Sequence, residues 1–397
     1  MATFDEGISE TLSLLRRKGG MTRAEIVAET GLSRSGVNLR IDALLEGRLV
    51  TGSAREVATK GRPAEVFSFN SERGKLLAAD VGATKFRAGL CNLGGDVESE
   101  IERPSDVTAG PEVLLASILE CFESFLRDTG TDADEILGIG LSLPAPVKRG
   151  SGMSVNPPIM PLWNRFDVPA WFHERFASSP VFLEKDANAM AYGEARFSHP
   201  EADDLLLVKI GTGIGSGLIR EGSLYRGADG AAGDLGHIPM TLPGDDEGPL
   251  CKCGNHGCLE ARAGGWAILR DLQETGSTAT SQDDLIAALA SGDPTAVQLA
   301  RRAGQVIGTA VATAVNLLNP RVVVLAGHLV AAGGDHLLPA IRERVYSRSL
   351  PLATSELSIV ASSLHPREGL VGLAHLVSDG ILEPAEIGRL VDRGGSA

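Results

Sequence analysis

The spacing of apolar residues near the start of the chain indicates helices separated by short turns. Apolar positions at helical spacing across residues 8–15 predict a first helix. Thr22 and Glu25 have the spacing of a capping box, which predicts that a second helix begins at residue 23. We expect this helix to end at Gly31, because glycine readily adopts the positive φ found at helix C-termini.

A third helix is predicted over about residues 34–45, with Ser33 as its N-cap. Its apolar face would pack on a core through Ile41 and Leu44. The polar and basic residues left on the outward face are Arg34, Ser35, Asn38 and Arg40. Arginine and asparagine suit base edges and phosphates in a major groove, so we expect this helix to read DNA.

Two stretches with strand-like alternation follow, at residues 49–52 and 65–69. The basic run Lys60-Gly61-Arg62-Pro63 lies between them, and it would place Arg62 against phosphate or the minor groove. This order predicts that residues 1–72 form a winged helix-turn-helix DNA-binding domain. A small three-helix module for protein contacts is the alternative interpretation.

The remainder of the chain contains two apolar strands that each run into a glycine-containing turn. The strand over residues 74–81 leads into Asp80-Val81-Gly82-Ala83-Thr84, and the strand over 204–210 leads into Gly211-Thr212-Gly213. Backbone N–H groups in such turns can hold phosphate, and Asp80 would hold Mg²⁺ through water. One such turn is commonly just a hairpin. The pair indicates a duplicated α/β core, with lobes over 73–190 and 191–397 and a cleft between them.

Three of the five cysteines lie close together at Cys251, Cys253 and Cys258, with His237 upstream. Three thiolates and one imidazole make a tetrahedral set that suits structural zinc. His256, inside the cysteine run, is an alternative fourth ligand. The other cysteines, Cys91 and Cys121, stand in apolar contexts typical of buried thiols.

Composition narrows the class of protein. Hydrophobic residues make up 43% and charged residues 22%, as in ordinary globular proteins, and no apolar segment is long enough to span a bilayer. Sparse, clustered cysteines favour a reducing cytoplasm over a secreted disulfide framework. The net charge of −14 argues against nucleic acid as a partner of the whole chain. Residues 1–75, however, hold 12 basic against 10 acidic residues, which separates a slightly basic head from an acidic body.

Together these motifs resemble the ROK family of repressors, open reading frames and kinases. The cysteine cluster matches the family pattern Cys-x-Cys-Gly-x-x-Gly-Cys-x-Glu in full, and the resemblance covers about residues 8–385. The head is similar to that of xylose- and N-acetylglucosamine-type regulators. The resemblance implies a two-lobed, actin-like sugar kinase (ribonuclease H-like) ATPase fold, with the C-terminal helix packing back on the first lobe.

The resemblance also implies roles for individual residues. Contacts to ATP phosphates, with Mg²⁺, would come from Asp80, Gly82, Thr84, Gly211, Thr212 and Gly213. The sugar pocket would be lined by Asn156, Asp186, Asp234, His237 and Glu260. Zinc would be held by His237, Cys251, Cys253 and Cys258. In a kinase Asp186 would be the general base. Read without the family, Asp186 could merely cap a helix, and Glu260 could be a solvated helix-start residue.

Three positions depart from the kinase pattern of the family. Lys185 replaces an asparagine before Asp186, where a cation would favour the ionised carboxylate and weaken it as a base. Asp234 replaces a glutamate, and His328 replaces glycine near the expected adenosine side. These departures favour a sugar-responsive transcriptional repressor of carbohydrate metabolism that binds operator DNA as a homodimer or homotetramer. An ATP-dependent hexose or N-acetylhexosamine kinase is the alternative.

Overall fold

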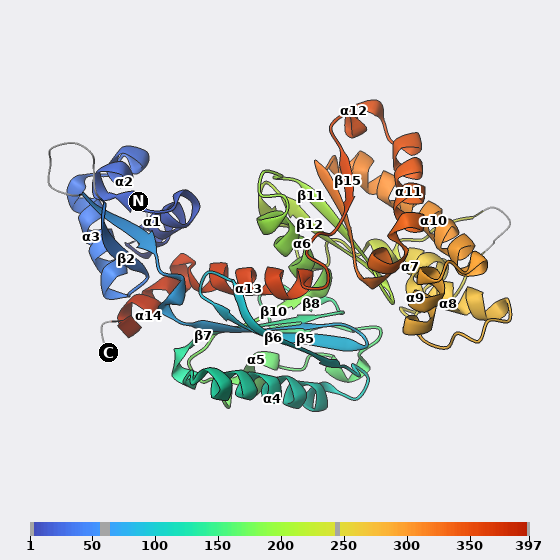
Figure 1. Ribbon diagram of the computed structural model, residues 1–397, viewed down its shortest axis with the longest axis horizontal. Helices are drawn as coiled ribbons and strands as arrows, with labels where there is room; N and C mark the ends of the chain where they lie inside the picture. The colour runs from blue at the N-terminus through green and yellow to red at the C-terminus, as the bar shows by residue number, and fades with distance from the viewer. Residues whose placement is uncertain (1–3, 56–63, 243–246, 395–397) are drawn as a thin grey trace.

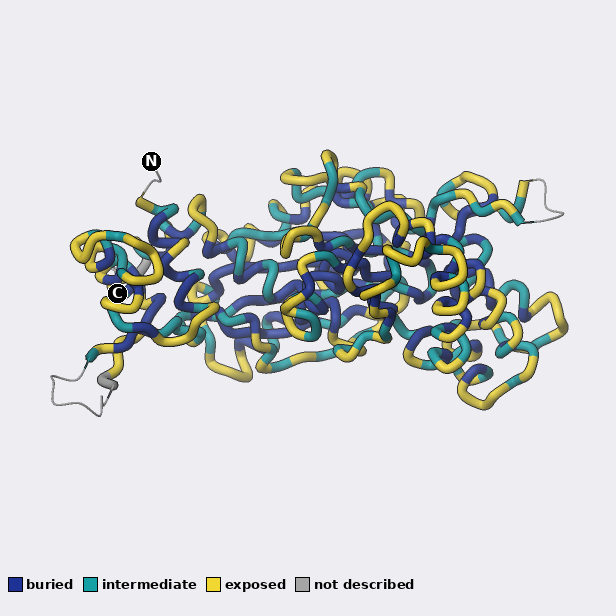
Figure 2. Tube along the Cα trace, turned by 90° about the horizontal axis from the view of Figure 1, so that it is seen from above, coloured by how far each residue is buried: buried dark blue, intermediate teal, exposed yellow. Residues whose placement is uncertain are grey.

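A computed structural model describes residues 4–55, 64–242 and 247–394 of the chain. A small head, a first lobe and a second lobe follow one another along the long axis of the molecule (Figure 1). Buried segments run through the middle of each part, and exposed loops lie at the edges (Figure 2). No helix in the described ranges combines the length and apolar character needed to cross a bilayer.

The head contains three helices and a three-stranded antiparallel sheet of order β1-β3-β2. The helices are α1 (Phe4–Lys18), α2 (Arg23–Thr30) and α3 (Arg34–Glu46), and the strands are β1 (Met21–Thr22), β2 (Val50–Arg55) and β3 (Ala64–Phe69). The capping box predicted at Thr22 is present, Gly31 has a φ of 68°, and the Ser33 side chain caps α3. Local capping therefore sets the helix boundaries, and the predicted winged helix-turn-helix fold is confirmed.

The first lobe is built on a five-stranded sheet of order β10-β7-β4-β5-β6. Its strands are β4 (Lys75–Val81), β5 (Lys85–Asn92), β6 (Val97–Pro104), β7 (Ile136–Leu143) and β10 (Val181–Lys185), with a small hairpin of β8 (Val147–Lys148) and β9 (Met153–Ser154). Its helices are η1 (Ser71–Arg73), α4 (Pro111–Thr129), η2 (Ala133–Glu135), η3 (Pro161–Trp163) and α5 (Val168–His173). Helix α4 covers the lower face of the sheet (Figure 1).

The second lobe repeats this plan with a sheet of order β13-β12-β11-β14-β15. Its strands are β11 (Leu205–Ile210), β12 (Ile214–Arg220), β13 (Ser223–Leu224), β14 (Val322–Ala326) and β15 (Ser358–Ala361). Its helices are η4 (Leu235–His237), α7 (Leu259–Ala263), α8 (Gly265–Glu274), α9 (Gln282–Ala290), α10 (Pro294–Leu318), α11 (His328–Arg348) and α12 (Pro351–Thr354). In both sheets a hairpin, β4–β5 or β11–β12, pairs with a parallel strand. This repetition places the two glycine-containing turns in equivalent positions.

Two helices, α6 (Asp186–Phe197) and α13 (Glu368–Ile381), lie against each other between the two sheets. Their backbones touch, because a Cβ at Gly372 would lie 1.8 Å from the Ala189 carbonyl oxygen. Helix α13 packs on the first-lobe strands β4 and β7 although it follows the whole second lobe in sequence. The last helix, α14 (Pro384–Gly394), continues to the head and packs on α1 and α3.

Candidate functional site

The outward surface of α3 is the candidate DNA-reading surface of the head. Arg34, Ser35 and Asn38 are exposed there, together with Leu39, whose side chain is 59% exposed. The opposite face buries Val37 and residues beyond it, as the apolar spacing predicts. Arg62 lies outside the described residues.

Arg40 does not share this outward face, and the sequence-based placement was wrong for this side chain. It follows the buried Val37 by three residues, so it falls at the edge of the core-facing side of α3. Its side chain is 17% exposed, and its Nη1 lies 3.8 Å from Glu10 Oε2 on α1. Its guanidinium packs against Gly7, where a Cβ would come within 2.4 Å. Arg40 therefore joins α3 to α1.

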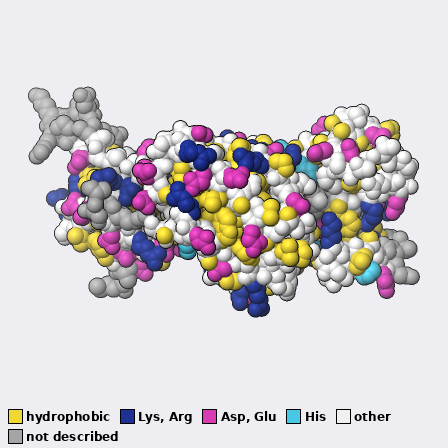
Figure 3. All heavy atoms as spheres, turned by 90° about the horizontal axis from the view of Figure 1, so that it is seen from below, with side chains coloured by type: hydrophobic (Ala, Val, Ile, Leu, Met, Phe, Trp, Pro, Cys, Tyr) yellow, Lys and Arg dark blue, Asp and Glu magenta, His cyan; other side chains and the backbone are white. Residues whose placement is uncertain are grey.

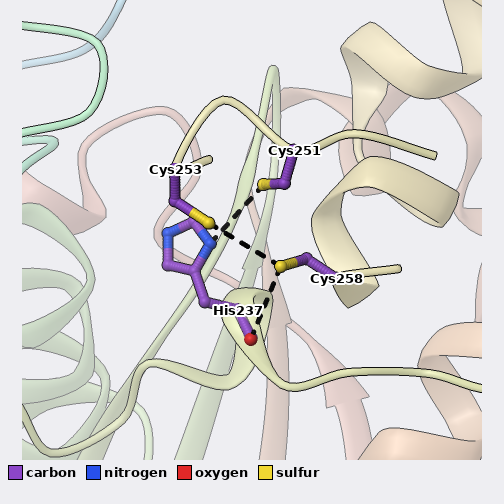
Figure 4. Close-up of side chains that lie close together, drawn as sticks. All are labelled: His237, Cys251, Cys253 and Cys258. Carbon is purple, nitrogen blue, oxygen red and sulfur yellow. Dashed lines mark hydrogen bonds between the residues drawn. The ribbon is translucent and has the colours of Figure 1, made fainter. Parts of the chain in front are cut away.

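A compact group of sulfur and nitrogen atoms lies between η4 and α7 (Figure 4). The ligand atoms of His237, Cys251, Cys253 and Cys258 all lie within 4.8 Å of one another. Cys251 Sγ is 3.7 Å from His237 Nδ1, and Cys253 Sγ is 3.7 Å from Cys258 Sγ. The alternative ligand, His256, is exposed and its Nδ1 instead contacts the Gly248 carbonyl at 3.2 Å. The donor set suits zinc in a closed tetrahedral site.

The cysteine loop also fixes the start of α7, which carries Glu260. The backbone of Leu259 donates to the Ile238 carbonyl at 2.9 Å, so the loop is tied to the segment after His237. Glu260 Oε2 accepts from the Ile214 N–H at 3.0 Å, and Oε1 accepts from Trp266 Nε1 at 3.3 Å. Glu260 therefore joins the metal loop to the second glycine-containing turn, and it is not a solvated helix-start residue.

A cavity of about 290 Å³ lies in the cleft between the lobes, beside the metal loop. Both glycine-containing turns and most predicted sugar residues line it: Gly82, Thr84, Lys185, Asp186, Lys209, Thr212, Gly213, Asp234, His237, Glu260 and His328. Asn156 is exposed, has a φ of 45° and is not among the lining residues, although the nearby Pro158 and Ile159 are. The structure thus brings together residues from four predicted motifs and leaves Asn156 outside.

Lys185 is paired with Asp234 rather than with its neighbour Asp186. Its Nζ donates to Asp234 Oδ1 at 2.9 Å and to the Gly233 carbonyl at 3.1 Å, and its side chain is only 6% exposed. The expected effect of Lys185 on the ionisation of Asp186 is therefore not supported by a contact between the two side chains. The two departures from the kinase pattern, at positions 185 and 234, are two halves of one ion pair.

The cation that does contact Asp186 is Lys209, which the sequence reasoning missed. Asp186 begins α6, and its Oδ2 accepts from Lys209 Nζ on β11, while its Oδ1 accepts from the Ala187 N–H at 2.6 Å. A lysine inside the otherwise apolar strand Leu205–Ile210, next to a glycine-containing turn, was the available signal.

Asp80 lies just beneath the cavity at the end of β4. Its Oδ1 accepts from the Ser142 hydroxyl, and burial raises its pKa to about 6, although Lys209 and this hydrogen bond act in the opposite direction. His328, at the start of α11, packs against Gly211. Burial, with Lys209 nearby, lowers the pKa of His328 to about 4, so its ring is neutral near pH 7.

Comparison with protein-family models decides the family. The model of the ROK family matches residues 76–380, which is most of the chain. The chain belongs to the ROK family. A model described as winged helix-turn-helix DNA-binding matches residues 9–51, so this ROK protein carries a DNA-binding head in front of the family domain.

Known proteins of two kinds are similar to it, repressors and sugar kinases. The xylose repressor of Bacillus subtilis is 28% identical over 384 residues, covering 96% of this chain and 97% of that protein. The glucokinase of Thermotoga maritima is 30% identical over 322 residues, covering 77% of this chain and 98% of the glucokinase. A crystal structure of a ROK family transcriptional regulator, a homologue of the Escherichia coli MLC protein, superposes with a TM-score of 0.83 at 25% identity and covers 98% of this chain and 99% of its own.

Proposed function

We propose that this protein is a sugar-responsive transcriptional repressor of carbohydrate metabolism. The observation that carries the proposal is the joining of a winged helix-turn-helix head to a ROK domain with a lined cleft, in one chain. The similarity to a xylose repressor over almost the full length of both proteins supports it, whereas the glucokinase similarity covers 77% of this chain.

On the DNA side, Arg34, Ser35 and Asn38 on α3 are the proposed contacts, with Arg62 on the wing. The body is a poor competitor for nucleic acid, because its basic side chains on β5 and β6 are paired with acids. Arg87 lies 2.5 Å from Glu102, and both signs of charge are interspersed over the body (Figure 3). A single head makes few base contacts, so we expect a homodimer or homotetramer that presents paired heads to an operator.

On the ligand side, a sugar would bind in the cavity against Asp186, Asp234, His237 and Glu260. Carboxylates and an imidazole offer the directional hydrogen bonds that sugar hydroxyls require. Zinc on His237 and the three cysteines would hold this wall in place. Asn156 would contribute only if its loop moves toward the cavity when sugar binds.

Helix α6 provides a physical route from the cavity to the head. It begins at Asp186 in the cavity and ends near Asp379 of α13. There Asp379 is bound by Arg196 of α6 at 2.5 Å and by Arg16 of the head helix α1 at 2.6 Å. A shift of α6 on sugar binding would therefore reach the head through one shared carboxylate.

The test measures binding of the full chain to the DNA upstream of its own gene. Fluorescence anisotropy at several salt concentrations gives the affinity. We expect Arg34→Ala to weaken binding about tenfold, as for other base or phosphate contacts. Arg301→Ala, which removes an exposed arginine on α10 of the second lobe, is the matched control and should bind normally. Absence of salt-sensitive, sequence-preferring binding by the unaltered protein would contradict the proposal.

An ATP-dependent sugar kinase is the second candidate, favoured by the presence of Asp186 in the cavity and by the glucokinase similarity. A coupled ADP-release assay with hexoses and N-acetylhexosamines separates the two candidates. Sugar-dependent turnover that Asp186→Asn abolishes would establish the kinase.

A further inference from the structure

The floor of the cleft holds a lysine among three carboxylates. Lys209 Nζ donates to Asp186, and the side chains of Asp80 and Glu368 are close enough for their charges to act on it. Burial alone would lower the pKa of Lys209, but the charges of Asp186 and Asp80 more than offset this and raise it. Lys209 is therefore a fixed ammonium ion, and 23% of its side chain remains exposed toward the cavity.

The ammonium ion of Lys209 lies beside the two glycine-containing turns, where a nucleotide would be expected to bind. In the ROK resemblance, Asp80 and Asp186 flank the place where Mg²⁺ and the phosphates of a nucleotide would lie. Carboxylates are the ligands that Mg²⁺ uses in proteins. Here one oxygen of Asp186 is taken by the ammonium ion and the other by the Ala187 N–H. Asp80 in turn accepts from Ser142. A divalent cation would have to displace Lys209 or lie against a like charge.

The phosphate-binding capacity of the turns is also partly used. The Gly82 N–H donates to the Lys85 carbonyl at 2.8 Å, and the Gly211 N–H donates to the Gly213 carbonyl at 3.0 Å. Ile214, directly after the second turn, donates to the Glu260 carboxylate. A Cβ on Gly213 would come within 2.2 Å of Glu260 Oε2, so a carboxylate lies directly against the second turn and would repel a phosphate held there. These residues do not fit a metal–nucleotide complex.

Three of the four lysines in the cavity wall have anionic partners. Lys185 is bound to Asp234 and Lys209 to Asp186, while Lys85 lies 3.5 Å from Glu102. Lys252, the remaining lysine in the wall, lies over the Trp266 ring at 5.4 Å. Because these opposite charges neutralise one another, the cavity offers hydrogen bonds rather than a net positive charge. That chemistry matches an uncharged polyhydroxylated ligand better than a sugar phosphate.

We propose that Lys209 is a specificity-determining residue whose ammonium ion occupies the place of the divalent cation, so that the cleft takes an uncharged sugar without a metal–nucleotide partner. This inference rests on the proposed function and deepens it, because it names the ligand class of the same cleft. It also assigns one residue as the cause of nucleotide exclusion.

The test uses Mn²⁺ as a probe of the cation position in the zinc-loaded full chain. Electron paramagnetic resonance measures how much Mn²⁺ is bound. Lys209→Thr frees the carboxylate of Asp186 and removes the positive charge near Asp80, so it should bind Mn²⁺ at least tenfold more tightly than the unaltered protein. Lys185→Thr is the matched control, because it removes another lysine of the cavity wall but frees only the carboxylate of Asp234. Its Mn²⁺ affinity should stay that of the unaltered protein. Lys209→Gln keeps a long side chain but removes its charge. If Lys209→Thr fails to fold, the Mn²⁺ affinity of Lys209→Gln is compared with that of Lys185→Thr instead.

A second arm measures ligand binding to the unaltered protein by calorimetry, with sugars, sugar phosphates and a non-hydrolysable ATP analogue with Mg²⁺. We expect an uncharged sugar to bind with an affinity that the analogue changes less than twofold. Tight Mn²⁺ binding by the unaltered protein, equal Mn²⁺ affinities of the Lys209 and Lys185 variants, or a tenfold gain in sugar affinity with analogue would overturn the inference. Operator binding is measured in a separate experiment. A failure to bind operator would contradict the proposed repressor function, while the Mn²⁺ and sugar titrations would still test the role of Lys209.

Discussion

Single side chains in the cleft show where sequence reasoning succeeds and where it stops. The motif identifies Asp186, Asp234 and Glu260 as cavity residues, and the structure places all three in the wall. Which cation each carboxylate meets depends on strands distant in sequence, so Lys185 was assigned to the wrong neighbour and Lys209 was missed. Adjacent residues in a chain point to different sides of it, and only the fold decides which charges meet.

His375 offers a pH-dependent test of the packing between α13 and α6. Its ring packs on Phe197 at 4.7 Å, and burial lowers its pKa from 6.5 to about 4, with Arg16 and Arg196 adding to this effect and Asp379 opposing it. The unfolded chain binds a proton near pH 6.5, whereas the folded chain does so only near pH 4. Stability is therefore complete above pH 6.5 and falls as the pH drops toward 4.

The expected size of this loss between pH 7 and pH 5 is about 2 kcal/mol, from the difference between the two pKa values. Urea unfolding at the two pH values measures it. His375→Phe keeps an aromatic ring and removes the titration, so it should lose about 2 kcal/mol less than the unaltered protein over this interval. Equal losses in both proteins would show that folding does not lower the pKa of His375.

The helices and strands themselves follow closely from local signals. Caps at Thr22 and Ser33, the left-handed Gly31 and the strand–glycine–strand repeats all appear where the sequence predicts them. The contact of α6 with α13 was not predictable, because it depends on Gly193 and Gly372 facing each other across a large separation in sequence. That contact makes α6 part of a closely packed helix pair that spans from the cavity to Asp379.

Asp379→Asn should weaken the communication between cavity and head. The amide keeps the size of the side chain but removes the charge that holds both Arg16 and Arg196. We expect the effect of sugar on DNA affinity to shrink at least fivefold, while sugar affinity itself changes less than twofold. Anisotropy titrations with and without sugar provide the measurement.

Glu123→Gln is the control for this experiment, because it breaks a surface ion pair with Arg175 at 2.5 Å in the first lobe, away from the route. Its sugar response should match that of the unaltered protein. If Asp379→Asn retains the full response, the signal travels by another path.

Across the whole molecule the head and the metal loop lie at opposite ends (Figure 1). The loop supports His237, Asp234 and Glu260 in the cavity of the body, whereas α3 lies in the head (Figure 1). The sequence predicted the parts of this arrangement, since each motif is local. The family resemblance implied that the C-terminal helix packs back on the first lobe, and α13 lies on β4 and β7 of that lobe. The packing of α14 on the head was not predicted, because it joins elements at distant positions in the sequence.

Removing zinc should therefore abolish the sugar response before it abolishes DNA binding. Cys253→Ser and chelator-treated protein should both have well under one zinc per chain and lose sugar-dependent change in DNA affinity. Operator affinity without sugar should stay within about threefold, because the head is remote from the loop. Metal analysis and anisotropy on the same samples check this, and parallel loss of both activities would contradict it.

Helix α14 has a consequence for the order in which the protein matures. Its Ile387 and Leu390 complete the core that Ile8 and Leu12 begin, and Ser9 Oγ donates to the Leu382 carbonyl at 2.7 Å. The ribosome makes the DNA-binding head before the two lobes, yet residues that follow both lobes complete its hydrophobic core. A nascent chain thus acquires a fully packed head only after its sensor domain has been synthesised.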